Sequence, residues 1–234
     1  MSGTPGTPAE RHEMAAYVEQ LFRDAGAYRE GHFELKSGRH ADRYIEKFQV
    51  LQHPAIVSEL CRLVADRVWQ PGAEPAIDLV VGPTTGGVIL AFEVARQLGV
   101  RGIFAEQVRR PPPEGTTRPR GRPLMQRRFR RGFRIEPGQR VLLVDDIVTT
   151  GASLVEMLEP IEGMQGELVL AVVLVDRSGG VSEIESPTSG RRYPVEALWT
   201  LDLPTYAPGA ETCPGCRDNV ELETPGSAGT ATTD

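Results

Sequence analysis

The amino-acid sequence predicts one α/β domain, with a mostly parallel β-sheet flanked by helices. Three short apolar runs, at residues 77–81, 141–144 and 168–175, have the length and composition of strands buried on both faces. Apolar residues recur at helical spacing at residues 86–98 and 153–161, between these runs. Strands that alternate with helices favour parallel pairing, and a chain of 234 residues is long enough to bury one such core.

The segments before the first apolar run add two helices and a hairpin. Helical spacing predicts a helix over residues 13–25, with Gly26 as its stop, and another over residues 54–68, with Pro54 at its start. Between them, the segment HFELKSGRHADRYIEKF alternates apolar and polar residues on both sides of a Ser-Gly turn. This pattern predicts a β-hairpin. A further short strand is expected at residues 102–105.

The ends of the chain and one internal stretch are expected to lie outside the core. Residues 1–10 and 225–234 are rich in Thr, Gly, Ser, Ala and Pro, which predicts disordered tails around a single domain at residues 11–224. Residues 106–127 hold five prolines and few apolar side chains. A loop of this length in a compact domain is usually a functional lid, so we expect a flexible flap.

Charge and hydropathy exclude several classes of protein. The net charge is −6, so no nucleic-acid partner is expected for the molecule as a whole, although arginines crowd residues 109–134. That patch suits polyanions, including a phosphate or pyrophosphate held in a cleft. No apolar run approaches the roughly 20 residues that cross a bilayer, and the first residues do not resemble a signal peptide. We therefore expect a cytoplasmic protein with no membrane association.

The three cysteines are too few for a disulfide framework. Cys213 and Cys216 form a CPGC unit, but a closed zinc site needs two more ligands, and no second CxxC or HxxxH motif supplies them. No metal site is therefore expected, and a surface turn pinned by Pro214 and Gly215 is the default interpretation. A redox pair is disfavoured because no strand precedes the unit and no helix signal follows it.

The segment VLLVDDIVTTGAS, residues 141–153, holds the chemistry. Ligands of open α/β sheets lie beyond the carboxyl ends of the strands, where Asp145 and Asp146 are expected. Carboxylates accept hydrogen bonds from vicinal sugar hydroxyls, and the TTGAS that follows offers hydroxyls and the free amides of a helix start to a phosphate. The pattern therefore predicts a sugar-phosphate site. A buried strand with an acidic helix cap would explain one aspartate but not the whole cluster.

DDIVTTGAS resembles the signature of the type I phosphoribosyltransferases, which use phosphoribosyl pyrophosphate. HFELKSGRHADRY, GPTTGGVILAFEVA, LVDR and YAPGAETCPGC resemble segments of the orotate-using members, over about residues 17–227. The resemblance implies the fold of that family, with an N-terminal hairpin hood and a flexible loop, and a homodimer. It implies the transfer of a phosphoribosyl group to orotate, giving orotidine 5'-monophosphate and pyrophosphate in UMP biosynthesis, with Mg²⁺ held by the pyrophosphate of the substrate.

The resemblance also implies a role for each matching residue. The catalytic residues would be Asp145, Asp146 and Lys36. The residues that bind phosphoribosyl pyrophosphate would be Asp145, Asp146, Ile147, Val148, Thr149, Thr150, Gly151, Ala152, Ser153, Arg109 and Arg110. Those that bind orotate would be Lys36, Tyr44, Thr149 and Arg177, since an arginine fork suits a carboxylate and an aromatic ring stacks on a planar base. Taken singly, Lys36 and Arg177 also suit an exposed surface, and Tyr44 suits a core contact.

The flexible loop departs from the family pattern. Family members hold lysines and a histidine there, whereas this chain offers arginines, Glu106 and Glu114. Arginine neutralises pyrophosphate but does not release a proton at ordinary pH, so a general acid in this loop is in doubt. Two other functions stay open: a salvage phosphoribosyltransferase for purines or another base, and a regulator that senses phosphoribosyl pyrophosphate and binds nucleic acid.

Overall fold

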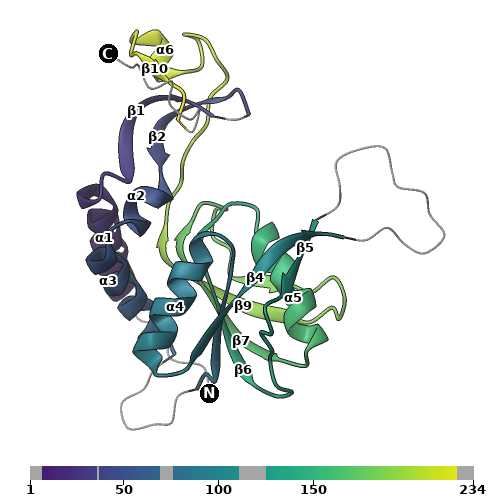
Figure 1. The fold of residues 1–234 in the computed structure, drawn as a ribbon. Coiled ribbons are helices and arrows are strands. Elements are labelled where there is room, and N and C mark those ends of the chain that lie inside the picture. The colour runs from purple at the N-terminus through teal and green to yellow at the C-terminus, as the bar shows by residue number, and fades with distance from the viewer. Residues whose placement is uncertain (1–6, 36, 69–75, 111–124, 226–234) are drawn as a thin grey trace, which may run out of the picture.

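The computed structural model describes residues 7–35, 37–68, 76–110 and 125–225. Its main body is a twisted seven-stranded sheet with the strand order β5-β4-β3-β6-β7-β9-β8 (Figure 1). The central strands β3, β4, β6, β7 and β9 pair in parallel, while β5 and β8 pair antiparallel at the two edges. The mostly parallel sheet predicted from the sequence is therefore confirmed. The strands are β3 (Leu79–Pro83), β4 (Arg101–Arg109), β5 (Met125–Phe129), β6 (Arg140–Val148), β7 (Glu167–Asp176), β8 (Glu183–Glu185) and β9 (Arg192–Thr200).

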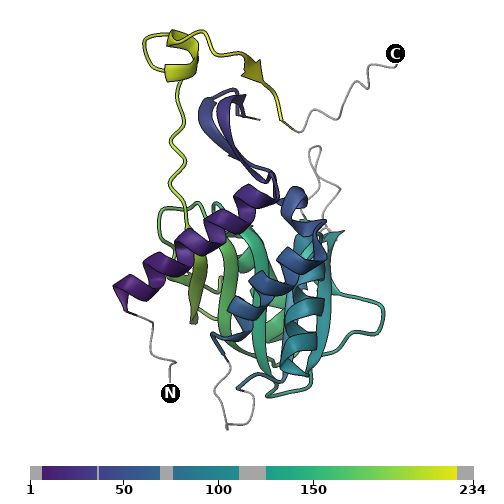
Figure 2. The same ribbon diagram turned by 90° about the vertical axis from the view of Figure 1, so that its left-hand side faces the viewer.

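Helices cover both faces of this sheet. The helices α1 (Pro8–Asp24), α3 (Pro54–Ala65) and α4 (Gly86–Leu98) lie on one face, and α5 (Ala152–Gly163) lies on the other (Figure 2). Successive side chains of a strand point to opposite faces. Thus Leu142 and Val144 belong to the core under α3 and α4, whereas Val141 and Leu143 belong to the core under α5. Burial on both faces is why β6 is a continuous apolar run.

A hairpin stands apart from the sheet as a hood. Strand β1 (Tyr28–Glu34) pairs antiparallel with β2 (His40–Ile45), and the short β10 (Leu222–Glu223) pairs parallel with β1 (Figure 1). The rings of Phe22 and Tyr28 pack against Trp199 with centroid distances of 5.6 and 5.5 Å, which fixes the base of the hairpin. The helix α2 (Lys47–Leu51) leads from the hairpin to α3, and α6 (Pro214–Arg217) lies near its far end.

The start of the chain differs from the sequence prediction. Helix α1 begins at Pro8, so residues 8–10 do not belong to a disordered tail. Thr7 and Glu10 form a capping box, in which the side chain of each residue accepts a hydrogen bond from the backbone amide of the other. The prediction used apolar spacing and overlooked this cap. Residues 1–6 and 226–234 lie outside the described residues.

The flap is shorter than predicted. Residues 106–109 belong to β4 and residues 125–127 to β5, where Gln107 pairs with Arg127 and Arg109 with Met125. Strand β5 lies at the edge of the sheet, and residues 106–109 extend β4 beyond its pairing with β3. This exposed ribbon holds many polar residues, so its composition resembles that of a loop. Residues 111–124, the rest of the expected flap, lie outside the described residues.

The CPGC unit is not an exposed turn. Cys213 is buried, Cys216 is half-buried, and the residues between them begin the one-turn helix α6.

Among the described residues, no helix has the length and apolar character needed to cross a membrane.

Candidate active site

The two neighbouring acids lie within β6 rather than after it. The strand was expected to end at residue 144, but it continues to Val148, and both carboxylates are almost fully buried. Because strand side chains alternate, Asp145 points toward α5 while Asp146 points toward α2 and α4. The pair therefore lies on both sides of the strand end, next to the turn that leads into α5.

Asp145 is fixed by two hydrogen bonds. The hydroxyl of Ser153 donates to Oδ2 at 2.9 Å, and the backbone amide of Asp146 donates to Oδ1 at 2.9 Å. Burial, and next the charge of Asp146, raises the pKa of Asp145 to about 6. The structure thus joins Asp145 to Ser153, the last residue of the motif.

Asp146 is paired with a lysine that the sequence analysis did not select. The Lys47 Nζ lies 3.0 Å from Oδ1 and 2.9 Å from Oδ2 of Asp146. Lys47 comes from the first turn of α2, directly after the hairpin, and is one of only two lysines in the chain. Its scarcity was the only signal in the sequence, because the contact joins residues 99 positions apart.

The turn after β6 has the form of an anion site. Thr149 and Thr150 are exposed, and Gly151 has φ 76°, a left-handed conformation that favours glycine. Helix α5 then starts at Ala152 and runs for 12 residues. Its first amides have no partners within the helix, and they lie at the positive end of the helix dipole, which stabilises a bound anion.

A second loop closes around Asp146 from the end of β3. A side-chain carbon on Gly86 would lie only 1.8 Å from Asp146 Oδ2, so the loop approaches the carboxylate as closely as glycine allows. The peptide between Thr84 and Thr85 in this loop is cis. Arg127 Nη1 donates to the carbonyl oxygen and the hydroxyl of Thr84, at 3.0 and 2.9 Å. Arg127 was placed in the flap by the sequence analysis, and its strand position was missed.

Tyr44 and Arg177 come together from β2 and from the end of β7. Burial is the main cause that lowers the pKa of Arg177, and the nearby Tyr44 opposes it. Burial likewise raises the pKa of Tyr44, with Glu46 adding to this effect and Arg177 opposing it. The Nε atom of Arg177 is buried without a hydrogen-bond partner among the described residues. Such a donor suits a bound anion.

The remaining predicted residues are not brought into this group. Arg109 and Arg110 are exposed at the end of β4, and Arg110 forms a 2.6 Å ion pair with Glu159 of α5. Within the described ranges, no hydrogen bond or ion pair joins either arginine to residues 145–153. Lys36 lies outside the described residues.

The Asp145→Asn variant is expected to be more stable than the wild type at pH 8. The pKa of Asp145 is raised above 3.8 on folding, so its contribution to stability is complete below pH 3.8 and is lost as the pH rises through about 6. Asparagine has no charge to lose and keeps partners for Ser153 and for the Asp146 amide. The free energy of unfolding, measured with urea, should rise by roughly 1–3 kcal/mol at pH 8, and this difference should vanish near pH 4. Equal stability at pH 8 would contradict this account.

Comparison with known proteins defines the class of this chain. The family model described as "Phosphoribosyl transferase domain" matches residues 48–198, from α2 to β9. These residues include the two acids, the turn and the loop after β3. The chain therefore belongs to the phosphoribosyltransferases.

The individual relatives define the branch of this family. A protein named orotate phosphoribosyltransferase from Pelotomaculum thermopropionicum is 42% identical over 210 residues, which are 90% of this chain and 96% of that protein. A relative with the same name from Caldicellulosiruptor bescii is 39% identical over 212 residues, 91% of this chain and 96% of its own. The crystal structure of orotate phosphoribosyltransferase from Aeropyrum pernix aligns with a TM-score of 0.55 and 26% identity, covering 79% of this chain and 93% of that one. This chain is a member of the orotate phosphoribosyltransferase family.

Proposed function

We propose that this enzyme transfers the phosphoribosyl group of phosphoribosyl pyrophosphate to orotate, giving orotidine 5'-monophosphate and pyrophosphate for pyrimidine biosynthesis. The observation that supports this most directly is the cluster at the end of β6. Two buried carboxylates lie beside an amide-rich turn, as a phosphorylated pentose requires. The two relatives described above, which align over 96% of their own length, are both named orotate phosphoribosyltransferase.

In this proposal each part of the sugar donor has a partner. Asp145 and Asp146 accept hydrogen bonds from the two ribose hydroxyls, and residues 147–153 hold the 5-phosphate. The loop at residues 84–87 and the arginines of β4 and β5 lie on the pyrophosphate side. Arg109 and Arg110 would take part only after breaking contacts such as the ion pair of Arg110 with Glu159. Mg²⁺ would enter as part of the substrate, because it prefers phosphate oxygens and water.

The acceptor base would lie under the hood. Arg177 supplies a buried guanidinium nitrogen to the carboxylate of orotate, and Tyr44 flanks its planar ring. Thr149 would border the base, and Lys36 would reach both orotate and pyrophosphate. A purine offers no carboxylate to Arg177, so this pair favours orotate over a purine base.

The reaction needs no covalent enzyme intermediate. A ring nitrogen of orotate forms a bond with C1 of the ribose and releases its proton to solvent, while pyrophosphate departs with the electron pair of the broken C1–O bond. The enzyme's contribution is to orient the sugar and to stabilise the charge of the departing pyrophosphate and of the cationic sugar. The ionised form of Asp145, which forms above about pH 6, suits both tasks.

An acceptor comparison tests the function. With phosphoribosyl pyrophosphate and Mg²⁺, orotate should be converted at least about 100-fold more efficiently than uracil, because uracil lacks the carboxylate and leaves Arg177 unpaired. Adenine and hypoxanthine should not react. Product is measured by chromatography of the nucleotide. Equal or better turnover of a purine would refute the assignment.

Two arginine variants sharpen this comparison. Arg177→Gln should raise the KM for orotate and reduce the preference over uracil, with little change in the affinity for phosphoribosyl pyrophosphate. Arg192→Gln is the matched control, because Arg192 is an exposed residue of β9 that pairs only with Glu183 and Glu185 of β8 among the described residues. If Arg177→Gln kept the wild-type preference for orotate over uracil, the base would have to bind elsewhere.

An exposed apolar patch on two neighbouring helices bears on the assembly of the protein. Phe48, Ile89 and Phe92 expose large apolar surfaces on the neighbouring helices α2 and α4, and Phe92 is 69% exposed. A patch of this kind suits an interface between two copies of the chain. We propose a cytoplasmic homodimer whose flap reaches the partner's active site. Sedimentation of a monomer at micromolar concentration would contradict the dimer.

A further inference from the structure

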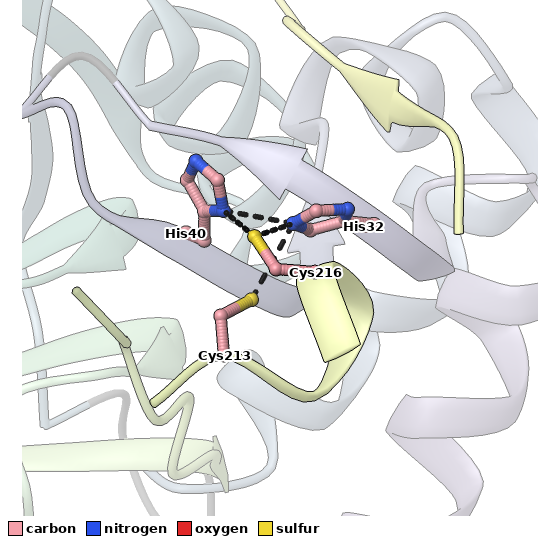
Figure 3. Close-up of side chains that lie close together, drawn as sticks. All are labelled: His32, His40, Cys213 and Cys216. Carbon is pink, nitrogen blue, oxygen red and sulfur yellow. Dashed lines mark hydrogen bonds between the residues drawn. The ribbon is translucent and has the colours of Figure 1, made fainter. Parts of the chain in front are cut away.

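Four side chains with metal-binding atoms converge at the far end of the hood. His32 lies on β1, His40 on β2, and Cys213 and Cys216 lie at the start and in the turn of α6 (Figure 3). One ligand atom of each residue lies within 4.8 Å of all the others. We call these four residues the His–Cys cluster. None of them belongs to the sugar-phosphate or base site described above.

The distances in the cluster resemble those around a tetrahedral ion. Cys213 Sγ lies 3.4 Å from His32 Nε2, and Cys216 Sγ lies 3.6 Å from His32 Nε2 and 3.2 Å from His40 Nδ1. With Zn–N near 2.0–2.1 Å and Zn–S near 2.3 Å, a tetrahedral site has sulfur–nitrogen separations of about 3.6 Å. The two ring nitrogens are 2.8 Å apart, and an ion bound to both would move them about half an ångström further apart.

The ring of His32 is oriented as in a metal ligand. Its Nδ1 lies 2.9 Å from the carbonyl oxygen of Val220, so this nitrogen donates and the lone pair of Nε2 points into the cluster. Histidines that bind metals commonly donate their second nitrogen in this way. Gly215 lies so close that an added side-chain carbon would be 2.4 Å from the ring, which holds His32 in place.

Hydrogen bonding accounts poorly for the two thiols of the cluster. His32 is 4% exposed, His40 is 6% exposed and Cys213 is 2% exposed. The two imidazoles can share one hydrogen bond at 2.8 Å, but thiols are weak donors, so the contacts of Cys213 and Cys216 with the imidazoles recover little of the cost of leaving water. Two thiolates and two imidazoles around one cation satisfy every inward lone pair, and this donor set is typical of structural zinc.

The far end of the hood lies outside the two main core clusters of the described residues. Tyr28 and Ile45, at the base of the hairpin, belong to the main core, whereas the buried Phe33, Ala41 and Cys213 belong to neither of the two described core clusters. Small elements without a core of their own are often held by a metal or a disulfide. We propose that the His–Cys cluster binds one Zn²⁺ ion as a structural cross-link between the hairpin and the segment at residues 206–223.

The sequence holds no second CxxC or HxxxH motif, and for this reason no metal site was expected. The two histidines are eight residues apart, and antiparallel pairing of β1 with β2 places them side by side. The fold therefore supplies the ligands that the spacing in the sequence did not reveal.

Metal analysis of the whole chain tests the proposal. Protein incubated with Zn²⁺ and then dialysed should keep about one zinc per chain by mass spectrometry of the metal. Protein reconstituted with Co²⁺ should show the intense visible absorption of tetrahedral cobalt, with thiolate-to-cobalt charge transfer. Zinc retention well below one per chain together with a featureless cobalt spectrum would overturn the proposal. A Cys213–Cys216 disulfide in freshly purified protein would overturn it as well.

Matched variants locate the metal. Cys216→Ser and His40→Gln should lose the bound zinc and lower the Tm, and a chelator should lower the Tm of the wild type but not of these variants. Cys61→Ala and His53→Gln are the controls, because Cys61 lies in α3 and His53 at its start, and both should keep the zinc. Zinc retained by Cys216→Ser and His40→Gln would overturn the site. If these variants fail to fold, the cobalt spectrum of the wild type decides.

Discussion

The Asp146→Asn variant is expected to lose about 10²- to 10³-fold in kcat/KM while it remains folded. Asparagine has nearly the same shape, but its NH₂ group donates where a ribose hydroxyl also donates. The change also removes the charge that faces Lys47 Nζ at 2.9 Å and leaves that cation without its partner. Steady-state kinetics with orotate and phosphoribosyl pyrophosphate measure the loss, and circular dichroism checks the fold.

The control for this variant is Asp66→Asn. Asp66 follows α3 on the surface, where its side chain is 51% exposed, and the substitution removes the same charge. It should leave kcat/KM within about twofold, since exposed ion pairs contribute little. A similar result for Asp146→Asn would show that this carboxylate does not hold the sugar.

The Gly82→Ala variant is expected to lose about 3 kcal/mol or more of stability. Gly82 lies in β3, and an added carbon would be 2.1 Å from the carbonyl oxygen of Gly87 and 2.6 Å from its carbonyl carbon. Backbone atoms cannot move aside as the end of a flexible side chain can. The loop that surrounds Asp146 would have to shift or the strand would have to break. Urea unfolding followed by circular dichroism measures the change.

Gly163→Ala separates this steric effect from the general effect of replacing glycine. Gly163 lies at the end of α5, and an added carbon there meets nothing within 4 Å. Alanine favours helix, so this variant should be as stable as the wild type or slightly more stable. A loss of less than about 1 kcal/mol in Gly82→Ala would show that β3 and α4 adjust to the extra carbon.

The sequence predicted most of the sheet and its helices because the central elements follow simple patterns. The predicted helix at residues 86–98 has the same bounds as α4, and the predicted hairpin is confirmed by the pairing of β1 with β2. The edge strands β5 and β8 and the strand β9 were missed. In β9, the buried Tyr193 and Val195 alternate with exposed residues, but polar and charged residues dilute the apolar signal. Edge strands need apolar residues on only one face, so their composition resembles that of a loop.

The sequence predicted the centre of the site but not its supports. The motif contains Asp145 and Ser153, and their contact spans only eight residues. Lys47 meets Asp146 across 99 residues, and Arg127 meets Thr84 across 43. Nothing in the local spacing encodes such pairs, because they depend on how the hairpin and the edge strand fold onto the sheet.

The His–Cys cluster has a consequence for how the protein is made. Cys213 follows His32 by 181 residues, so the ribosome synthesises the whole seven-stranded sheet before it adds the cysteines. A nascent chain that ends after β9 has every strand of the main sheet but lacks the two thiols that face the imidazoles of the hairpin. The far end of the hood therefore acquires its final structure last, whereas the base of the hairpin can already pack on Trp199. Newly made chains are expected to complete the hood only late in translation or after release.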